Sequence, residues 1–293
     1  MYRSKLLSVV CAACLATGIH NAAAGEMAVA WETEGMDVPE SALYDSANDV
    51  IYITNIVGGP TEADGKGHIS KLGIDGSVVE NEWVSGLNSP TGMALVDDKL
   101  YVADINTLLE IDTGSGEISN KFMAEEAGFL NDVTADDSGN VYVTDMMKDG
   151  IYQLSDGNFS LWLTDKQLEF PNGILADGDN LLVGSWGVLN GDGFNTDVAG
   201  HMKKVSIADK SIASVGDGGP VGNLDGVEPD GAGNYLVTDF LGGKLLKMSL
   251  TGEVEELVKF AQAGTADLGV AADKNLVIIP LMMDNKVVAY KLK

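Results

Sequence analysis

Residues 131–144 read NDVTADDSGNVYVT and set out the unit from which this chain is built. A polar residue begins a short apolar stretch, a turn of Asp, Ser, Gly and Asn follows, and residues 141–144 supply a second β-rich run. Turn residues between two β-branched or aromatic runs are typical of a β-hairpin. Two further β-rich segments, residues 150–154 and 159–163, complete a unit of four predicted strands.

The same order of features recurs along the chain. The six copies begin at Glu40, Thr91, Asn131, Asn172, Asp225 and Asp267, with spacings of 51, 40, 41, 53 and 42 residues. Self-similarity at a period of about 45 residues, with four strands in each unit, indicates the blades of a β-propeller. Amphipathic helical spacing occurs only briefly, around residues 119–129. We therefore predict an all-β fold, a six-bladed β-propeller with four antiparallel strands per blade.

The sixth unit is shorter than the others. Residues 267–293 hold only three predicted strands, whereas residues 27–31 near the N-terminus have strand character. A strand from the N-terminus can complete the last blade, close the ring and cover two sheet edges that would otherwise be open. We expect a single propeller over residues 25–293, its last blade closed by the N-terminal strand.

Residues 1–24 have the features of a secretory signal peptide. Arg3 and Lys5 precede an apolar run of 13 residues, and small residues follow. Such a run is too short to span a bilayer as a helix. We predict cleavage after Ala24, a periplasmic or secreted protein, and no stable membrane insertion after cleavage. A buried core helix, or a lipoprotein cysteine at Cys14, is the alternative.

Charge and composition exclude several classes of function. The sequence carries 18 Lys+Arg against 44 Asp+Glu, a net charge of −26, which repels nucleic acid and anionic membranes. Cleavage removes Arg3, the only arginine, together with both cysteines, and leaves 16 lysines, His68 and His201. Disulfides, thiol nucleophiles and Cys/His zinc sites are then excluded. Carboxylates, amides and hydroxyls must carry any chemistry, and we expect a small-molecule substrate.

The residues that begin the six units are expected to meet at one end of the central channel. Glu40 and Asp225 would bring two carboxylates there, and Asn131 and Asn172 two amide carbonyl oxygens. Converging carboxylates repel one another in a narrow channel, and a cation relieves that repulsion. Hard oxygen ligands favour Ca²⁺ over zinc or copper, with Mn²⁺ and Mg²⁺ as open alternatives.

Four of these positions lie in short motifs with a recognisable order and spacing: Pro39-Glu40, Asn131-Asp132, Pro171-Asn172-Gly173 and Asp225-Gly226. The set resembles the senescence marker protein/gluconolactonase family, which is similar to the diisopropylfluorophosphatases and, more distantly, to the paraoxonases and strictosidine synthases. The resemblance covers essentially the whole mature chain. It implies that Glu40, Asn131, Asn172 and Asp225 hold a catalytic divalent cation. It also implies that Asp225 is the general base or nucleophile.

The chain differs from members of this family at a position that is expected to contact the substrate. Sugar-lactonase members carry an arginine shortly before the asparagine that matches Asn131, whereas residues 128–130 here read GFL. We therefore expect a substrate more apolar than a sugar-acid lactone, with Phe129 and Leu130 in its pocket. Thr91 and Asp267 are expected to line the pocket wall.

Two other features concern the pocket. Residues 56–66 and 186–200 form loops longer than the repeat requires, and each joins a second strand to a third. That connection lies at the same end as the inner-strand starts, so we expect Trp186 to contact substrate at the channel mouth. A loop without any role in binding is the alternative. His68 and His201 do not match the histidine pair of the paraoxonases, and we expect ordinary structural roles for both.

These features together predict an exported, calcium-dependent hydrolase of a lactone, ester or phosphotriester. Asp225 would attack the substrate or deprotonate a water molecule. A non-enzymatic periplasmic binding or scaffolding propeller with a structural cation is the main alternative, because propellers host many functions. Lyase or isomerase chemistry in the same channel is a third possibility.

Overall fold

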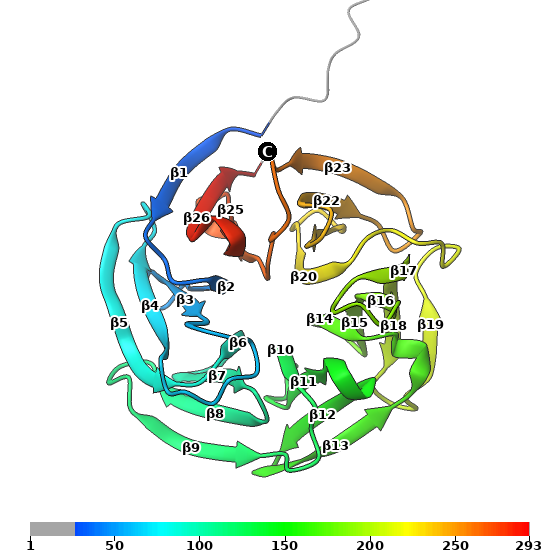
Figure 1. Cartoon of the computed structure of the whole chain (residues 1–293), viewed down its shortest axis with the longest axis horizontal. Helices are drawn as coiled ribbons and strands as arrows, with labels where there is room; N and C mark the ends of the chain where they lie inside the picture. The colour runs from blue at the N-terminus through cyan, green and yellow to red at the C-terminus, as the bar shows by residue number, and fades with distance from the viewer. Residues whose placement is uncertain (1–26, 293) are drawn as a thin grey trace, which may run out of the picture.

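Six four-stranded antiparallel sheets stand around a central channel (Figure 1). The computed structural model describes residues 27–292, so the predicted signal peptide lies outside the described part of the chain. The predicted six-bladed β-propeller is confirmed. Within residues 27–292 the helical segments are short 3₁₀ turns, and none has the length and hydropathy that crossing a membrane requires.

The first three blades follow the predicted order, with the first strand innermost. Blade 1 contains β2 (Pro39–Asp45), β3 (Val50–Asn55), β4 (Gly67–Gly73) and β5 (Val78–Leu87). Blade 2 contains β6 (Pro90–Val96), β7 (Lys99–Asp104), β8 (Thr107–Asp112) and β9 (Ile118–Met123). Blade 3 contains β10 (Leu130–Ala135), β11 (Val141–Asp145), β12 (Gly150–Ser155) and β13 (Asn158–Thr164), with turns η1 (Met146–Lys148) and η2 (Lys166–Leu168) after β11 and β13.

The last three blades include an added hairpin and the ring closure. Blade 4 contains β14 (Pro171–Asp177), β15 (Asn180–Ser185), β18 (Met202–Ser206) and β19 (Ile212–Ser214), and a separate hairpin of β16 (Gly187–Leu189) and β17 (Thr196–Ala199). Blade 5 contains β20 (Leu224–Pro229), β21 (Tyr235–Asp239), β22 (Lys244–Met248) and β23 (Val254–Lys259). Blade 6 contains β24 (Gly269–Ala271), β25 (Leu276–Leu281), β26 (Lys286–Lys291) and β1 (Val29–Glu34), with turns η3 (Ala272–Lys274) and η4 (Met282–Asp284).

The N-terminal strand closes the ring, as the short sixth unit predicts. β1 pairs antiparallel with β26, from Val29 opposite Tyr290 to Glu34 opposite Lys286. At the inner end of the same junction, the backbone N–H of Asp267 donates to the carbonyl oxygen of Glu40 at 2.9 Å. The outer and inner strands of the junction between blades 6 and 1 are therefore both held by backbone hydrogen bonds.

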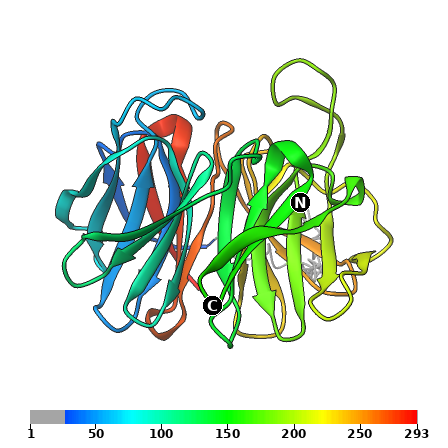
Figure 2. The same ribbon diagram turned by 90° about the horizontal axis from the view of Figure 1, so that it is seen from below.

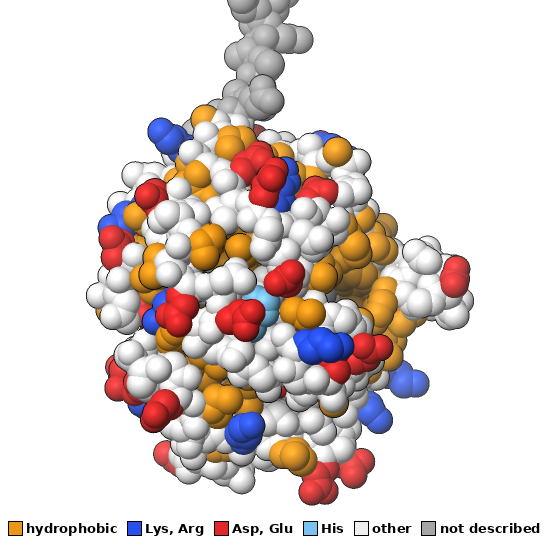
Figure 3. Space-filling model, turned by 60° about the vertical axis from the view of Figure 1, so that its left-hand side comes forward, with side chains coloured by type: hydrophobic (Ala, Val, Ile, Leu, Met, Phe, Trp, Pro, Cys, Tyr) orange, Lys and Arg blue, Asp and Glu red, His pale blue; other side chains and the backbone are white. Residues whose placement is uncertain are grey.

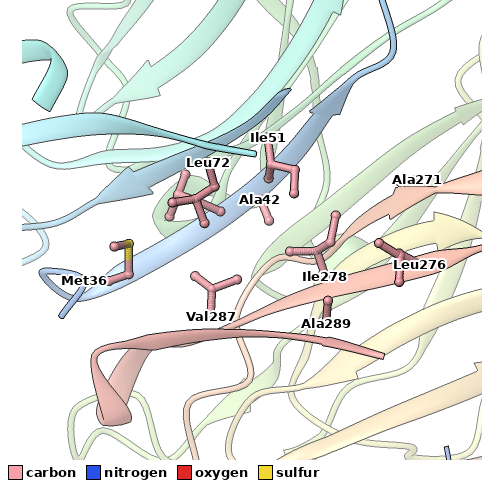
Figure 4. Close-up of a cluster of buried hydrophobic side chains, with 10 residues drawn as sticks. Met36, Ala42, Ile51, Leu72, Ala271, Leu276, Ile278, Val287 and Ala289 are labelled. Carbon is pink, nitrogen blue, oxygen red and sulfur yellow. The ribbon is translucent and has the colours of Figure 1, made fainter. Parts of the chain in front are cut away.

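The hydrophobic core lies between neighbouring blades and not in the channel. Each of the six junctions contains its own cluster of buried side chains. Figure 4 shows the junction of blades 6 and 1, where Ile51 and Leu72 face Ile278 and Val287. Because alternate residues of a strand point to opposite faces, the sheets bury apolar side chains on both faces while their inner edges remain free for polar groups.

A β-bulge interrupts the inner strand of blades 1 to 5 at the end that carries the candidate ligands. In blade 3 the register shifts between Leu130 and Val133, and blades 1, 2, 4 and 5 shift at the equivalent place. In three blades a threonine of the second strand replaces the lost ladder bond. In blade 3 the Asp132 N–H donates to Thr144 Oγ1 at 3.0 Å, and Thr54 and Thr238 accept equivalent bonds. Bulges beside functional sites re-aim side chains, and here they turn one residue per strand toward the channel end.

Two glycines allow the inner strands to approach one another closely. A Cβ atom on Gly173 would overlap the carbonyl oxygen of Asp225, and one on Gly226 would overlap the carboxylate of Asp267. Only glycine fits at these two positions without movement of the neighbouring backbone or carboxylate. The narrow channel thus depends on residues that directly follow the candidate ligands Asn172 and Asp225.

The junction of blades 6 and 1 provides a test of this architecture. Ile278 is fully buried there, so we expect Ile278→Ala to lower the free energy of unfolding by about 2–5 kcal/mol through lost burial and a residual cavity. Urea denaturation followed by circular dichroism measures this change. Val79→Ala on the exposed face of β5 is the matched control and should change stability by less than about 0.5 kcal/mol. Equal effects of the two substitutions would contradict the assignment of the core to the blade junctions.

Candidate functional site

One end of the channel opens into a cavity of about 370 Å³. Its polar residues are the bulge residues of five inner strands: Glu40, Thr91, Asn131, Asn172 and Asp225. All five side chains are buried. Four of the residues with predicted metal-binding roles therefore come together in one cavity, although 185 positions separate the first from the last.

Several polar atoms of this cavity lack a hydrogen-bond partner. The buried unpartnered atoms include Glu40 Oε2, Asn172 Oδ1 and Asp225 Oδ1. Leaving a buried oxygen unpaired costs about 1–3 kcal/mol, and more when the group is charged, so three such atoms in one cavity require an explanation. Each is a hard oxygen donor, and the residues present therefore fit a divalent cation. No group of three or more Asp, Glu, His or Cys side chains able to hold a metal occurs within residues 27–292, so amide oxygens would have to share the coordination.

The carboxylates of the channel lack compensating positive charge. Burial, reinforced by Asp225 and Asp267, raises the pKa of Glu40 well above its ordinary value. Burial and the proximity of Asp267 likewise raise the pKa of Asp225. Both shifts arise because two or more negative charges in a desolvated space repel one another. A bound cation reverses this effect, since it stabilises the ionised carboxylates.

Threonine side chains hold the backbone of the candidate ligands. Thr91 Oγ1 donates to the Asn131 carbonyl oxygen at 2.7 Å, and Thr144 Oγ1 donates to the Asn172 carbonyl oxygen at the same distance. Each bond joins one blade to the next at the height of the cavity. Thr91 lines the cavity as expected, and its hydroxyl is committed to this backbone contact.

Asp267 does not lie in this cavity. The bridge of Thr265 to Leu281 is equivalent to that of Leu130 to Asp145, so Ala266 occupies in blade 6 the position of Asn131. Asp267 is one residue further along, and it accepts a hydrogen bond from Ser41 Oγ at 2.5 Å. In the last blade the residue equivalent to Asn131 is therefore Ala266, one residue before the Asp267 with which the sequence repeat begins.

A second cavity of about 230 Å³ contains the carboxylates of the deeper positions. Asp132, Glu228 and Asp267 line it. Two backbone N–H groups, those of Val133 and Ile174, donate to the Asp132 carboxylate at 2.7 and 2.8 Å. Burial raises the pKa of Asp267 to about 7, and burial together with Asp267 raises the pKa of Glu228 to about 8.

The side chains of Phe129 and Leu130 lie in different places because neighbouring residues of a strand point in opposite directions. Phe129 lines the first cavity and packs with Met146 and Trp186. Leu130, also expected in the pocket, is instead fully buried in the cluster between blades 2 and 3. Asp145 fixes this arrangement, since its carboxylate accepts the Phe129 N–H at 3.0 Å.

The apolar wall of the cavity includes residues that the sequence reasoning missed. In every blade the residue immediately after the second strand is apolar: Ile56, Ile105, Met146, Trp186, Phe240 and Met282. Five of these line the cavity, and Ile105 is the exception. Alignment of the six units by their second strands, rather than by their first residues, would have revealed this repeated position.

The two long loops lie at the mouth of this cavity. Figure 2 shows the β16–β17 hairpin of the second loop (yellow-green) rising from the same end of the ring as η4 (red). Trp186 Nε1 donates to the Phe194 carbonyl oxygen at 2.8 Å, and the Trp186 ring lies 5.4 Å from that of Phe240. Trp186 thus reaches the expected pocket and also anchors the hairpin.

The two described histidines take no part in this cavity. His201 Nε2 lies 2.9 Å from Ser214 Oγ, and its Nδ1 is 3.9 Å from Glu169 Oε2. His68 is buried, with Nε2 3.9 Å from Asp37 Oδ2. Neither histidine is among the residues that line the cavity.

Comparison with known proteins agrees with the sequence motifs. A family model described as "SMP-30/Gluconolactonase/LRE-like region" matches residues 38–271, which confirms the resemblance inferred from the sequence. A search of curated proteins found no match.

Solved structures of lyases share the fold at low sequence identity. A catalytically inactive variant of virginiamycin B lyase from Staphylococcus aureus, solved with quinupristin, is 12% identical, with a TM-score of 0.58 over 90% of this chain and 99% of that chain. Another structure of virginiamycin B lyase from the same organism is 14% identical, with a TM-score of 0.59 and the same coverage. A streptogramin B lyase is 12% identical, with a TM-score of 0.60 over 90% of this chain and 98% of that chain.

The threonine bridge to Asn172 yields a prediction. Thr144→Val removes the partner of the Asp132 N–H and of the Asn172 carbonyl oxygen, so we expect a loss of about 1–3 kcal/mol in the free energy of unfolding. Should the cavity hold Ca²⁺, its binding would also weaken, because Asn172 loses its backbone support. Urea denaturation and calorimetric Ca²⁺ titration measure the two effects. Thr107→Val, whose hydroxyl contacts only the adjacent Asn106 side chain, is the matched control. Unchanged stability and Ca²⁺ affinity in Thr144→Val would contradict the bridge.

The raised pKa of a channel carboxyl predicts how stability depends on pH. The raised pKa of Glu228 favours its protonated form in the folded state, so its stabilising contribution is complete below about pH 4 and is lost as the pH rises through about 8. In the presence of chelator, Glu228→Gln should therefore be more stable than the parent at pH 9 by on the order of 1–2 kcal/mol, and similar to it near pH 4. Thermal denaturation across this range checks the prediction, with exposed Glu82→Gln as control. Destabilisation by Glu228→Gln at pH 9 would refute it.

Proposed function

The chain belongs to the SMP-30/gluconolactonase/LRE-like family, and we propose that it is a metal-dependent hydrolase of a lactone, ester or phosphotriester. The family includes lactonases and other hydrolases. The observation that carries the proposal is the set of unpartnered oxygens of Glu40, Asn172 and Asp225 in one buried cavity. Coordination of a divalent cation, most favourably Ca²⁺, accounts for all three atoms.

Glu40, Asn131, Asn172 and Asp225 are the residues that we propose as ligands. Their two carboxylates match the charge of a divalent cation, and the two neutral amides add oxygen donors without further repulsion. Lewis-acid polarisation of the substrate's carbonyl or phosphoryl oxygen is the chemistry that such a cation supplies when bound.

Asp225 is the residue that we propose for the reaction itself. Asp225 lies at the polar end of the cavity beside the other proposed ligands, so its carboxylate is placed to accept a proton or to attack. As a general base, Asp225 takes a proton from water while the water oxygen bonds to the carbonyl carbon or phosphorus. The bond to the leaving oxygen then breaks, and that oxygen takes a proton. As a nucleophile, a carboxylate oxygen of Asp225 bonds to the electrophilic centre while the bond to the leaving oxygen breaks and that oxygen takes a proton. Water then hydrolyses the covalent intermediate, which releases the product and restores the Asp225 carboxylate.

The surrounding side chains support this role by excluding water. Phe129, Met146 and Trp186 are buried and form an apolar wall beside the polar residues. An apolar, desolvated cavity strengthens electrostatic interactions with the reacting oxygen. We further propose that the protein acts outside the cytoplasm, on the evidence of residues 1–24, whose composition matches a signal peptide.

Purified protein assayed on aryl esters and lactones tests the proposed hydrolase. Chelation should abolish hydrolysis, and Asp225→Asn should lower kcat by about 10²–10⁴-fold while the fold is retained. Added Ca²⁺ should restore the chelated parent but not the variant. Asp217→Asn, in an exposed loop of the chain, is the matched control and should leave kcat unchanged.

Two outcomes would contradict the proposed reaction in different ways. Hydrolysis that survives both chelation and Asp225→Asn would remove the metal and the catalytic carboxylate together. A rise in melting temperature with Ca²⁺, without turnover of any substrate, would favour the alternative of a binding or scaffolding propeller with a structural cation.

A further inference from the structure

The apolar wall of the cavity continues onto the outer surface of the protein. Four side chains with exposed fractions from 37% to 58% surround the mouth: Met147, Phe194, Leu241 and Met283. Three of them line the cavity itself, and Met147 directly follows the lining residue Met146. Figure 3 shows hydrophobic side chains gathered at its right-hand edge, beside a projecting loop, while charged side chains are scattered over the facing side. We call these four residues the apolar rim. The apolar wall of the cavity and the apolar rim form one continuous surface.

The side chains that line the cavity offer no cationic group to a negatively charged substrate. Among the described residues that line it, none is Lys, Arg or His. Glu40 and Asp225 lie at its polar end, and Asp132 and Asp267 are further along the channel. The charge of the proposed divalent cation is already balanced by the Glu40 and Asp225 carboxylates, so an anionic carboxylate or phosphate would lose its hydration without an ion pair to a Lys, Arg or His side chain. An uncharged substrate meets no such penalty.

The cavity is equally unsuited to a polyol. Apart from the backbone, its hydrogen-bonding groups are the side chains of Glu40, Thr91, Asn131, Asn172 and Asp225, all at the polar end. We propose that this end binds the reacting carbonyl or phosphoryl group, which leaves the remaining hydroxyl groups of a sugar lactone against hydrocarbon. Burying a hydroxyl without a partner costs roughly 1–3 kcal/mol in proteins.

The rim is uneven around the ring, and this gives the substrate a direction. Blades 3 to 6 contribute apolar side chains at the mouth, from η1, the β16–β17 hairpin, residues 240–241 and η4. The equivalent loop of blade 1 contributes Ile56 and Pro60 to the cavity lining but also carries the acidic residues Glu62 and Asp64, and blade 2 has only the short connection between Asp104 and Thr107. A hydrocarbon chain that leaves the cavity therefore meets the larger apolar surface on the side of blades 3 to 6.

We propose that the substrate is an uncharged ester or lactone with a hydrocarbon chain, which lies along the apolar rim over blades 3 to 6. This inference rests on the proposed hydrolase function and specifies its substrate class. Phe240 and Met282 determine specificity, because they are half-buried lining residues that directly precede the exposed Leu241 and Met283. A cavity of about 370 Å³ falls in the range of small-molecule sites, which run from about 300 to 1,000 Å³.

Hydrolysis of p-nitrophenyl acetate, butyrate, hexanoate and octanoate tests the chain-length dependence. Full burial of each methylene predicts a rise in kcat/KM of about threefold to fourfold per carbon until the chain passes the rim. Phe240→Asn and Met282→Gln should each lower kcat/KM for the octanoate at least tenfold, relative to the acetate. Met123→Gln, 63% exposed on the outer strand β9, is the matched control and should leave both values unchanged. Circular dichroism melting verifies that each variant is folded.

Binding of non-hydrolysed probes separates the cavity from the reaction. We expect 2-octanone to bind more tightly than 2-butanone, and at least tenfold more tightly than octanoate, by competition or by quenching of Trp186 fluorescence. A Trp186→Phe variant identifies the signal from that residue. Equal binding of the two ketones, or octanoate binding as tight as 2-octanone, would overturn the proposed substrate class. Chain-length-dependent ketone binding with no ester or lactone hydrolysis would reject the hydrolase and retain the apolar rim.

Discussion

Repulsion between buried carboxylates is the constraint on which the rest of this molecule depends. Glu40 and Asp225 share a narrow cavity with unpartnered oxygens, and Asp132, Glu228 and Asp267 add negative charge further along the channel. A chain with 44 acidic residues could have placed these groups in water, where they cost nothing. Instead, the bulges, the threonine bridges and the close-packed glycines hold these carboxylates together. An arrangement that costs free energy in this way is expected of a functional site rather than of a scaffold.

The fold can carry this unfavourable centre because its stability is located elsewhere. Six separate clusters of apolar side chains fill the blade junctions, and the channel contributes little to them. The inner edges of the sheets are therefore available for polar residues without loss of core packing. The same separation lets the connections between second and third strands vary, and in blade 4 this connection has become the β16–β17 hairpin beside the cavity.

The sequence predicts the features that repeat. Turn residues between β-rich runs identify the blades, the short last unit identifies the closing strand, and four polar repeat positions identify the cluster at the channel end. Features set by register are harder to infer. Leu130 and Phe129 are neighbours in sequence, yet strand alternation sends one into a blade junction and the other into the cavity. Asp267 is predicted to line the pocket wall, yet the strand pairing of blade 6 places Ala266 at the equivalent position. An apolar residue follows each second strand in the sequence, but this repeat is hard to recognise because the side chain differs from blade to blade.

The closure of the ring places a proposed ligand at the joint between the first and last blades. The carbonyl oxygen of Glu40 accepts the N–H of Asp267, the hydrogen bond that joins the inner strands of the first and last blades. Any fraying that separates these blades, by thermal motion or by a protease at the N-terminal strand, removes the support of Glu40 before it disturbs the other three ligands. An ion held by Glu40 would in turn oppose such fraying. If the cavity holds a cation as proposed, its occupancy and the lifetime of the closed ring are linked, and removal of the cation would let the ring open sooner.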